Sequence, residues 1–251
     1  RLAQPDRGGA RGESCVGLIL LLPDLSPGDA RRWHRAIQTV QPEPTNRRTV
    51  MAKEIQAGVF IPTVLRSGWV HSTNAPNAPG SFKHALEVTR LAEYLGFDFV
   101  LSPQNWRGAQ GPHRFWGDTV DSIAAAGALS QATDRINIWC TAHISVHKPA
   151  VIAKIVASLS EISEGRIGLN VVTGGNYMQL YPLGFWDDLG HDERYDVAQD
   201  WVTLIRKYRS EAVVTHDGPY FKADGGILSP RPARRPTLAI GPEPAGSPSQ
   251  K

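Results

Sequence analysis

At 251 residues, the chain is long enough for one large α/β domain or two small ones. Its 41% hydrophobic and 20% charged residues are typical of a globular protein and argue against a disordered or fibrous chain. The net charge is only +3 and the basic residues form no long run, so we expect no nucleic-acid partner.

The cysteines and the apolar runs point to a protein of the cytoplasm. Cys15 and Cys140 lie far apart and suggest neither a disulfide framework nor a zinc site. The apolar run at residues 16–22 holds seven residues, whereas a bilayer span needs roughly 20. We therefore expect a cytoplasmic protein without a membrane segment.

The two ends of the chain differ from the rest. Residues 1–50 are rich in Arg, Pro, Gly and Gln and show no sustained period, although residues 30–40 are compatible with a short helix. Met51 resembles a translation start, so we interpret residues 1–50 as a poorly structured extension without a chemical role. Residues 241–251, rich in Pro, Gly and Ser, are predicted to be a disordered tail.

Between these ends, apolar runs of strand length alternate with segments of helical period. In chain order, the sequence predicts a strand at 55–62, a helix at 82–95, a strand at 97–102, a helix at 118–132, a strand at 135–142, a helix at 149–162, a strand at 166–172, a helix at 192–209 and a strand at 236–240.

Alternating strands and helices imply parallel strands joined by right-handed crossovers. No glycine-rich phosphate loop follows the first strand, and a long loop at residues 63–80 takes its place. This favours a TIM (β/α)8 barrel over a doubly wound sheet. We predict a barrel domain at residues 51–240 that is truncated at its C-terminal side after about five strands.

Polar and aromatic residues follow the first three predicted strands. Trp69 and His71 could line a flat aromatic ligand, or Trp69 could simply anchor a packed loop. The amides of Gln104 and Asn105 could bind the edge of a ring or stabilise a turn. His143 and His147 lie in a predicted loop without a matching carboxylate motif, so we predict no metal site.

A more coherent set surrounds the glycines at 174–175. Asn170 lies near the end of a strand, Gln179 follows the glycines, and Arg194 and Tyr195 lie in the first turn of a helix. A helix N-terminus with an arginine can cradle a phosphate, but the same residues could form a capping and salt-bridge cluster. Together the residues suggest an anionic, planar ligand on a barrel rim.

Several ordered motifs then resemble the bacterial luciferase-like flavin monooxygenases. They are GVFIP at 58–62, GWVHSTNAP at 68–76, FDFVLS at 97–102 with WRG at 106–108, GRIGLNVVTG at 165–174, HDERY at 191–195 and LSPRP at 228–232. The most similar branch is that of the pyrimidine monooxygenases, followed by the alkanesulfonate and dimethyl sulfone monooxygenases.

The resemblance implies a two-component monooxygenase. Reduced FMN (FMNH2) comes from a separate NAD(P)H-dependent flavin reductase, and O2 adds to it to give a flavin peroxide that oxygenates a small organic substrate. The substrate would be a pyrimidine, an alkanesulfonate or a sulfone, and the resemblance is compatible with a homo-oligomer. Alternatives are a deazaflavin-dependent hydride-transfer oxidoreductase of the same superfamily and an inactive truncated paralogue.

The resemblance also assigns the FMN contacts, with Arg194 on the phosphate side. They are Gln104, Asn105, Asn170, Gln179, Arg194 and Tyr195. The catalytic residues stay unassigned, with Trp69 and His71 as candidates. The chain departs from the pyrimidine branch at two places, where Gln104-Asn105 replaces an aliphatic residue and Lys, and Gln179 replaces Glu.

Overall fold

A computed structural model describes residues 18–20, 56–64, 80–108, 114, 116–174, 177–232, 234 and 236–240. Trp69, His71, the helix considered at 30–40 and the tail at 241–251 lie outside these residues. Among the described residues, none of the helices combines the length and the hydrophobicity that a membrane span requires.

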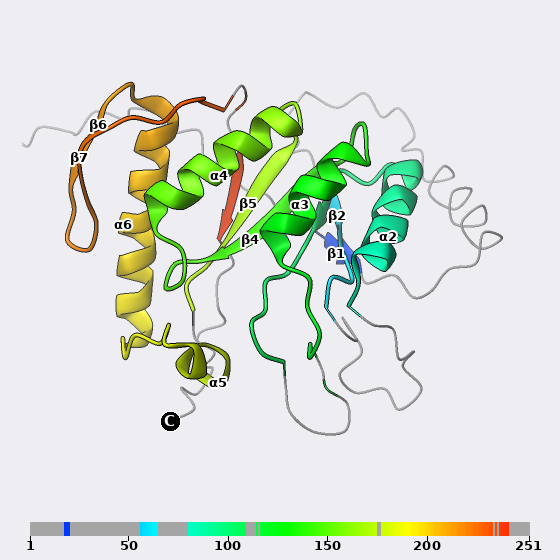
Figure 1. The fold of residues 1–251 in the computed structure, drawn as a ribbon, viewed down its shortest axis with the longest axis horizontal. Helices are drawn as coiled ribbons and strands as arrows, with labels where there is room; N and C mark the ends of the chain where they lie inside the picture. Colours follow the sequence, from blue (N-terminus) through cyan, green and yellow to red (C-terminus); the bar gives the residue numbers. More distant parts are fainter. Residues whose placement is uncertain are drawn as a thin grey trace, which may run out of the picture.

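The centre of the molecule is a six-stranded parallel sheet (Figure 1). Its strands lie side by side in the order β1-β2-β3-β4-β5-β8. Their bounds are β1 Leu18–Leu20, β2 Ala57–Phe60, β3 Phe99–Leu101, β4 Asn137–His143, β5 Ile167–Val172 and β8 Thr237–Ile240. This order contains no reversal, which is typical of a section of a (β/α)8 barrel and not of a doubly wound sheet.

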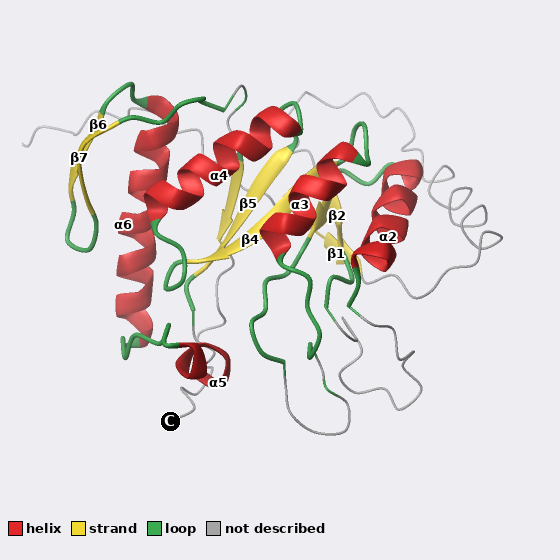
Figure 2. Cartoon of the chain, viewed as in Figure 1, coloured by secondary structure: helices red, strands yellow, loops and turns green. Residues whose placement is uncertain are grey.

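The connecting helices α2, α3 and α4 lie over one face of this sheet (Figure 2). They span Phe82–Leu95, Ser122–Gln131 and Pro149–Ile162, and α6 (His191–Ser210) packs against α4. In α4, Ile152, Val156 and Leu159 recur at helical spacing and are buried in the main core. The same core includes Val100, Ile138 and Leu169, one residue from each of three neighbouring strands.

The other face of the sheet carries the alternate residues of each strand. The rings of Phe99 and Trp139 stack there with centroids 4.3 Å apart. Gly168 on β5 makes room for this indole, since a Cβ at Gly168 would lie 2.5 Å from Trp139 Cδ1. In a barrel this is the inner face, and the polar residues Thr141, His143 and Asn170 follow on it toward the carboxyl ends of the strands.

The predicted strands and helices are confirmed, with shifted bounds. The largest shift is at α3, which was predicted from residue 118 and begins at Ser122. Asp121 caps it, because its carboxylate accepts hydrogen bonds from the amides of Ile123 and Ala124 at 3.0 and 2.8 Å.

Five elements were not predicted. The strand β1 lies inside residues 1–50 and pairs with β2; the apolar run at residues 16–22 that contains it shows no alternation of polar and apolar residues. A short helix, α5 (Tyr177–Leu180), is followed by a 3-10 turn at Tyr181–Leu183. The strands β6 (Val214–Asp217) and β7 (Lys222–Gly226) form an antiparallel hairpin.

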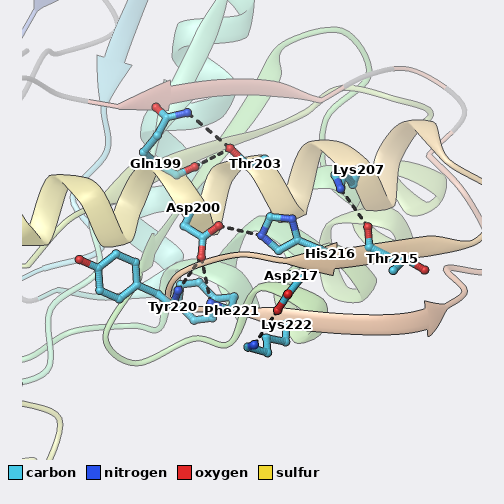
Figure 3. Close-up of polar contacts among 10 residues, drawn as sticks. All are labelled: Gln199, Asp200, Thr203, Lys207, Thr215, His216, Asp217, Tyr220, Phe221 and Lys222. Atoms are coloured by element: carbon cyan, nitrogen blue, oxygen red, sulfur yellow. Dashed lines mark hydrogen bonds and ion pairs between the residues drawn. The ribbon is translucent and has the colours of Figure 1, made fainter.

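This hairpin is fastened to α6 by one buried carboxylate (Figure 3). Asp200 Oδ1 lies 2.7 Å from His216 Nε2, and Asp200 Oδ2 accepts hydrogen bonds from the amides of Tyr220 and Phe221 at 3.0 and 2.9 Å. Both side chains are buried, so the hairpin and the helix form one unit.

Candidate functional site

A layer of hydrogen-bonded polar side chains crosses the carboxyl ends of β3, β4 and β5. The carbonyl of Ser102 accepts bonds from Ser122 Oγ and from Thr141 Oγ1, both at 2.8 Å. Thr141 Oγ1 in turn accepts a bond from Asn170 Nδ2 at 3.2 Å. The layer places Asn170 on the inner face of the sheet, at the edge where barrel proteins bind ligands.

Gln104 belongs to the same layer and holds the start of α3. Its Nε2 donates to Asp121 Oδ2 and its Oε1 accepts from the amide of Ser122, both at 2.7 Å. Both polar ends of this side chain therefore bind the helix N-terminus, and the side chain is buried. The structure thus gives Gln104 a positioning role beside the predicted site.

Asn105 and Gln179 are in direct contact. Gln179 Nε2 donates a hydrogen bond to Asn105 Oδ1, and Asn105 Nδ2 donates to the carbonyl of Trp116 at 2.8 Å. Both residues are buried, and they come from α5 and from the loop after β3. Two of the departures from the pyrimidine branch are therefore neighbours in space.

His143 is the last residue of β4 and lies next to this layer. Its Nε2 is 3.3 Å from the carbonyl oxygen of Gln104, and its side chain is buried. Burial lowers the pKa of His143 to about 4; the contact with the Gln104 carbonyl opposes this shift and the neighbouring His147 adds to it. His143 is therefore neutral at pH 7.

A pocket of about 80 Å³ lies beside the carboxyl ends of β4 and β5, large enough for a group bigger than a water molecule. Its polar lining includes Ser145, Lys148, Thr173, Asp187 and Arg194. Two cations and one carboxylate therefore face this space, and its net formal charge is positive.

The backbone shapes the same pocket. Gly174 has a φ of +94°, and a Cβ there would lie 3.9 Å from Arg194 Cδ, so the arginine side chain lies along the glycine turn. Lys148 is the N-cap of α4, so the positive end of this helix's dipole lies next to a residue of the pocket lining. These features together suit an anion.

Arg194 and Tyr195 are the fourth and fifth residues of α6 and so lie near the helix start, as predicted. An Arg194 guanidinium nitrogen lies 3.4 Å from the carbonyl oxygen of Leu189, and the rings of His191 and Tyr195 are 5.2 Å apart. A hydrogen bond from the middle of α6 also helps to fix the position of this helix. Trp201 Nε1 donates to the carbonyl of His147 at 2.8 Å. That bond joins α6 to the loop that carries Ser145 and Lys148.

The structure thus sorts the predicted residues into two groups. Gln104, Asn105, Gln179 and Asn170 belong to the buried polar layer and its neighbours, whereas Arg194 lines the pocket. Sequence analysis did not assign Lys148, and it considered His143 only as a metal ligand. Residues two apart in a strand lie on the same face. The spacing of Thr141 and His143 could therefore have shown that the histidine lies on the face of β4 that carries Thr141.

The sequence pattern of the luciferase-like monooxygenase family matches residues 55–247, which is more than half of the chain. A pyrimidine monooxygenase, RutA, of Rhizobium rhizogenes (strain K84) is 37% identical over 179 residues, which cover 71% of this chain and 49% of the relative. The chain therefore spans about half the length of this curated relative.

Two solved structures have a similar fold. The EDTA monooxygenase of Chelativorans sp. BNC1 superposes with a TM-score of 0.62 at 20% identity, covering 75% of this chain and 49% of that chain. An F420-dependent secondary alcohol dehydrogenase superposes with a TM-score of 0.54 at 28% identity, covering 63% of this chain and 48% of that chain. The predicted barrel-type α/β fold is confirmed, and the chain belongs to the luciferase-like monooxygenase family.

Proposed function

We propose that this chain binds FMN and forms the flavin site of a two-component monooxygenase. The enzyme would take reduced FMN from a separate NAD(P)H-dependent reductase and insert one oxygen atom of O2 into a small organic substrate. Family membership and the pyrimidine monooxygenase relative support this proposal. When it is bound, reduced FMN supplies the electrons that activate O2.

The observation that carries the proposal is the cationic pocket beside the polar layer. A phosphate monoester carries up to two negative charges at pH 7 and accepts several hydrogen bonds. Arg194 and Lys148 provide the charge, and Ser145 and Thr173 provide hydroxyl groups. The residues present therefore fit the phosphate of FMN.

The polar layer would hold the ring system. Asn170 lies near the carboxyl end of β5, and the amide pair of Asn105 and Gln179 offers further polar atoms. Tyr195 lies beside Arg194 at the helix start and would contact the ribityl part of FMN, which links the ring system to the phosphate. In this arrangement Gln104 keeps the layer in place through α3.

The substrate class follows from the relatives. Pyrimidines are the leading class, because the curated relative is named a pyrimidine monooxygenase. Alkanesulfonates and sulfones are the next candidates. The neutral pair of Asn105 and Gln179 makes this site less charged than the Lys and Glu of the pyrimidine branch.

Two measurements test the proposal. Titration of oxidised flavins, followed by flavin fluorescence, should show saturable binding of FMN and weaker binding of riboflavin, which lacks the phosphate. With NAD(P)H and a flavin reductase, uracil, an alkanesulfonate or a sulfone should then increase oxygen uptake, and ¹⁸O2 should label the product with one atom.

The outcomes separate cofactor from substrate. Equal affinity for FMN and riboflavin would exclude the pocket as the phosphate site. Tight FMN binding without oxygenation of any of the three substrates would exclude the substrate classes and leave the cofactor assignment standing.

A second candidate is hydride transfer with a deazaflavin. It is favoured by the structural likeness to the F420-dependent secondary alcohol dehydrogenase. Titrating F420 beside FMN discriminates the two, since tighter F420 binding without oxygen consumption would support hydride transfer.

A further inference from the structure

His143 has a buried ring nitrogen that the interactions of the described residues leave unused. Its side chain is only 5% exposed, and its Nδ1 has no hydrogen-bond partner among the described residues. Buried polar atoms are normally paired, so an exception in a native structure points to strain, to an unseen partner or to function.

The tautomer of this ring follows from its other nitrogen. Nε2 lies 3.3 Å from the carbonyl oxygen of Gln104, and a carbonyl can only accept a hydrogen bond. Nε2 therefore carries the proton of the neutral ring. Nδ1 is left with a lone pair, so the missing partner must be a hydrogen-bond donor.

His143 lies between the polar layer and the residues that line the cationic pocket. Residues alternate between the two faces of a strand, so His143 shares the inner face of β4 with Thr141, which bonds to Asn170. The next residues along the chain, Ile144 and Ser145, line the cationic pocket. A ligand whose phosphate lies in that pocket and whose ring lies on the polar layer passes His143.

The ring nitrogens of FMN include suitable donors. Oxidised FMN has a single ring N–H, at N3, and the reduced form has additional ones. We propose that His143 Nδ1 accepts a hydrogen bond from the flavin N3–H and thereby helps to bind and orient the ring. This inference rests on the proposed function, because it takes the ligand to be FMN.

The test compares FMN with 3-methyl-FMN, which has a methyl group in place of the N3 hydrogen. Dissociation constants are measured by flavin fluorescence for the unchanged chain, for His143→Leu, which lacks an acceptor, and for His143→Gln, which retains one. Circular dichroism and urea unfolding show whether each variant is folded.

We expect the unchanged chain to bind FMN about tenfold or more tightly than 3-methyl-FMN. His143→Leu should bind both flavins with similar, weaker affinity, and His143→Gln should recover part of the preference. A second measurement needs no variant. The ¹⁵N resonance of Nδ1 should move upfield when FMN is added and stay in place with 3-methyl-FMN.

Three outcomes would overturn the inference. In the first, the unchanged chain binds both flavins equally well. In the second, the folded His143→Leu variant retains the full preference for FMN. Both would leave the flavin proposal intact, whereas a chain that binds neither flavin would overturn the proposed function and this inference together.

Discussion

Gln179 donates its side-chain N–H to Asn105 Oδ1, although 74 residues separate the two in sequence. Both side chains are buried, at 3% and 6% exposure. The contact joins the short helix α5 to the loop after β3. It also means that two substitutions relative to the pyrimidine branch act as one neutral pair.

Charged side chains at positions 105 and 179 should therefore be tolerated only when both positions carry them, with opposite signs. Asn105→Lys and Gln179→Glu should each lower the free energy of unfolding by about 3 kcal/mol, because each buries an unpaired charge. The double variant should recover most of this loss, since the two charges then pair. Urea unfolding at pH 7 measures all four chains.

Met178→Glu on the same short helix is the control, because Met178 is 61% exposed. It should change the stability by less than about 0.5 kcal/mol. Additive losses in the double variant would mean that the side chains at 105 and 179 do not interact.

Arg194 should distinguish flavins with and without a phosphate. Arg194→Ala should weaken FMN binding about tenfold or more, because a charge-assisted contact is lost, and should leave riboflavin binding nearly unchanged. Lys148→Ala should act in the same direction with a smaller effect, since Lys148 is the more exposed residue.

Arg206→Ala removes one positive charge from an exposed position of the same helix and serves as the matched control. Fluorescence titration with both flavins gives the comparison. If Arg194→Ala and Arg206→Ala weakened FMN binding equally, the effect would come from net charge and not from the pocket.

Substitution of Gly168 should destabilise the protein, because the indole of Trp139 lies beside this glycine. A Cβ in Gly168→Ala would lie 2.5 Å from Trp139 Cδ1, and the stacked Phe99 restricts movement of that ring. We expect a loss of about 1–3 kcal/mol in the free energy of unfolding.

Gly127→Ala is the informative counterpart. This glycine lies inside α3, and a Cβ there would make an ordinary contact of 3.4 Å with Leu159 Cδ2. Alanine should stabilise the helix by about 0.5–1 kcal/mol. Equal effects of the two substitutions in urea unfolding would contradict the role given to Trp139.

Asp200 should make the hairpin β6–β7 sensitive to acid. Burial raises the pKa of this carboxyl, but the amides of Tyr220 and Phe221 and the contact with His216 outweigh burial and leave the pKa below its usual value. A carboxylate whose pKa is lowered by folding stabilises the protein above the pKa of the unfolded chain, about 4. That stabilisation is lost as the pH falls through the lower pKa of the folded chain.

Asp200→Asn should therefore be less stable than the unchanged chain at pH 7, and the difference should shrink below about pH 4. Asp196→Asn, at an exposed position of the same helix, is the control for the removal of one carboxylate. Unfolding free energies measured from pH 3 to pH 7 test this. A constant difference between Asp200→Asn and the unchanged chain would mean that Asp200 does not titrate with a lowered pKa.

Much of the fold could be predicted because its signals are local. The helices α2 and α4 were predicted with the bounds that they have in the structure, since apolar residues at helical spacing and their flanking residues are read within one segment. The hairpin β6–β7 escaped prediction because most of its residues are polar or exposed. Its position is fixed by Asp200, a residue of a different element.

The candidate site, too, could be predicted only in part. Local sequence patterns predicted the alternation of strands and helices, hence which residues follow which strand, and so they placed Asn170 and Arg194 at one rim. The three-dimensional structure was needed to show that Asn105 meets Gln179 and that Lys148 joins Arg194 in one pocket. It was also needed to show that His143 Nδ1 has no hydrogen-bond partner among the described residues. The physical reason is that periodicity is a property of neighbouring residues, whereas these contacts depend on how parallel crossovers bring the ends of different strands together.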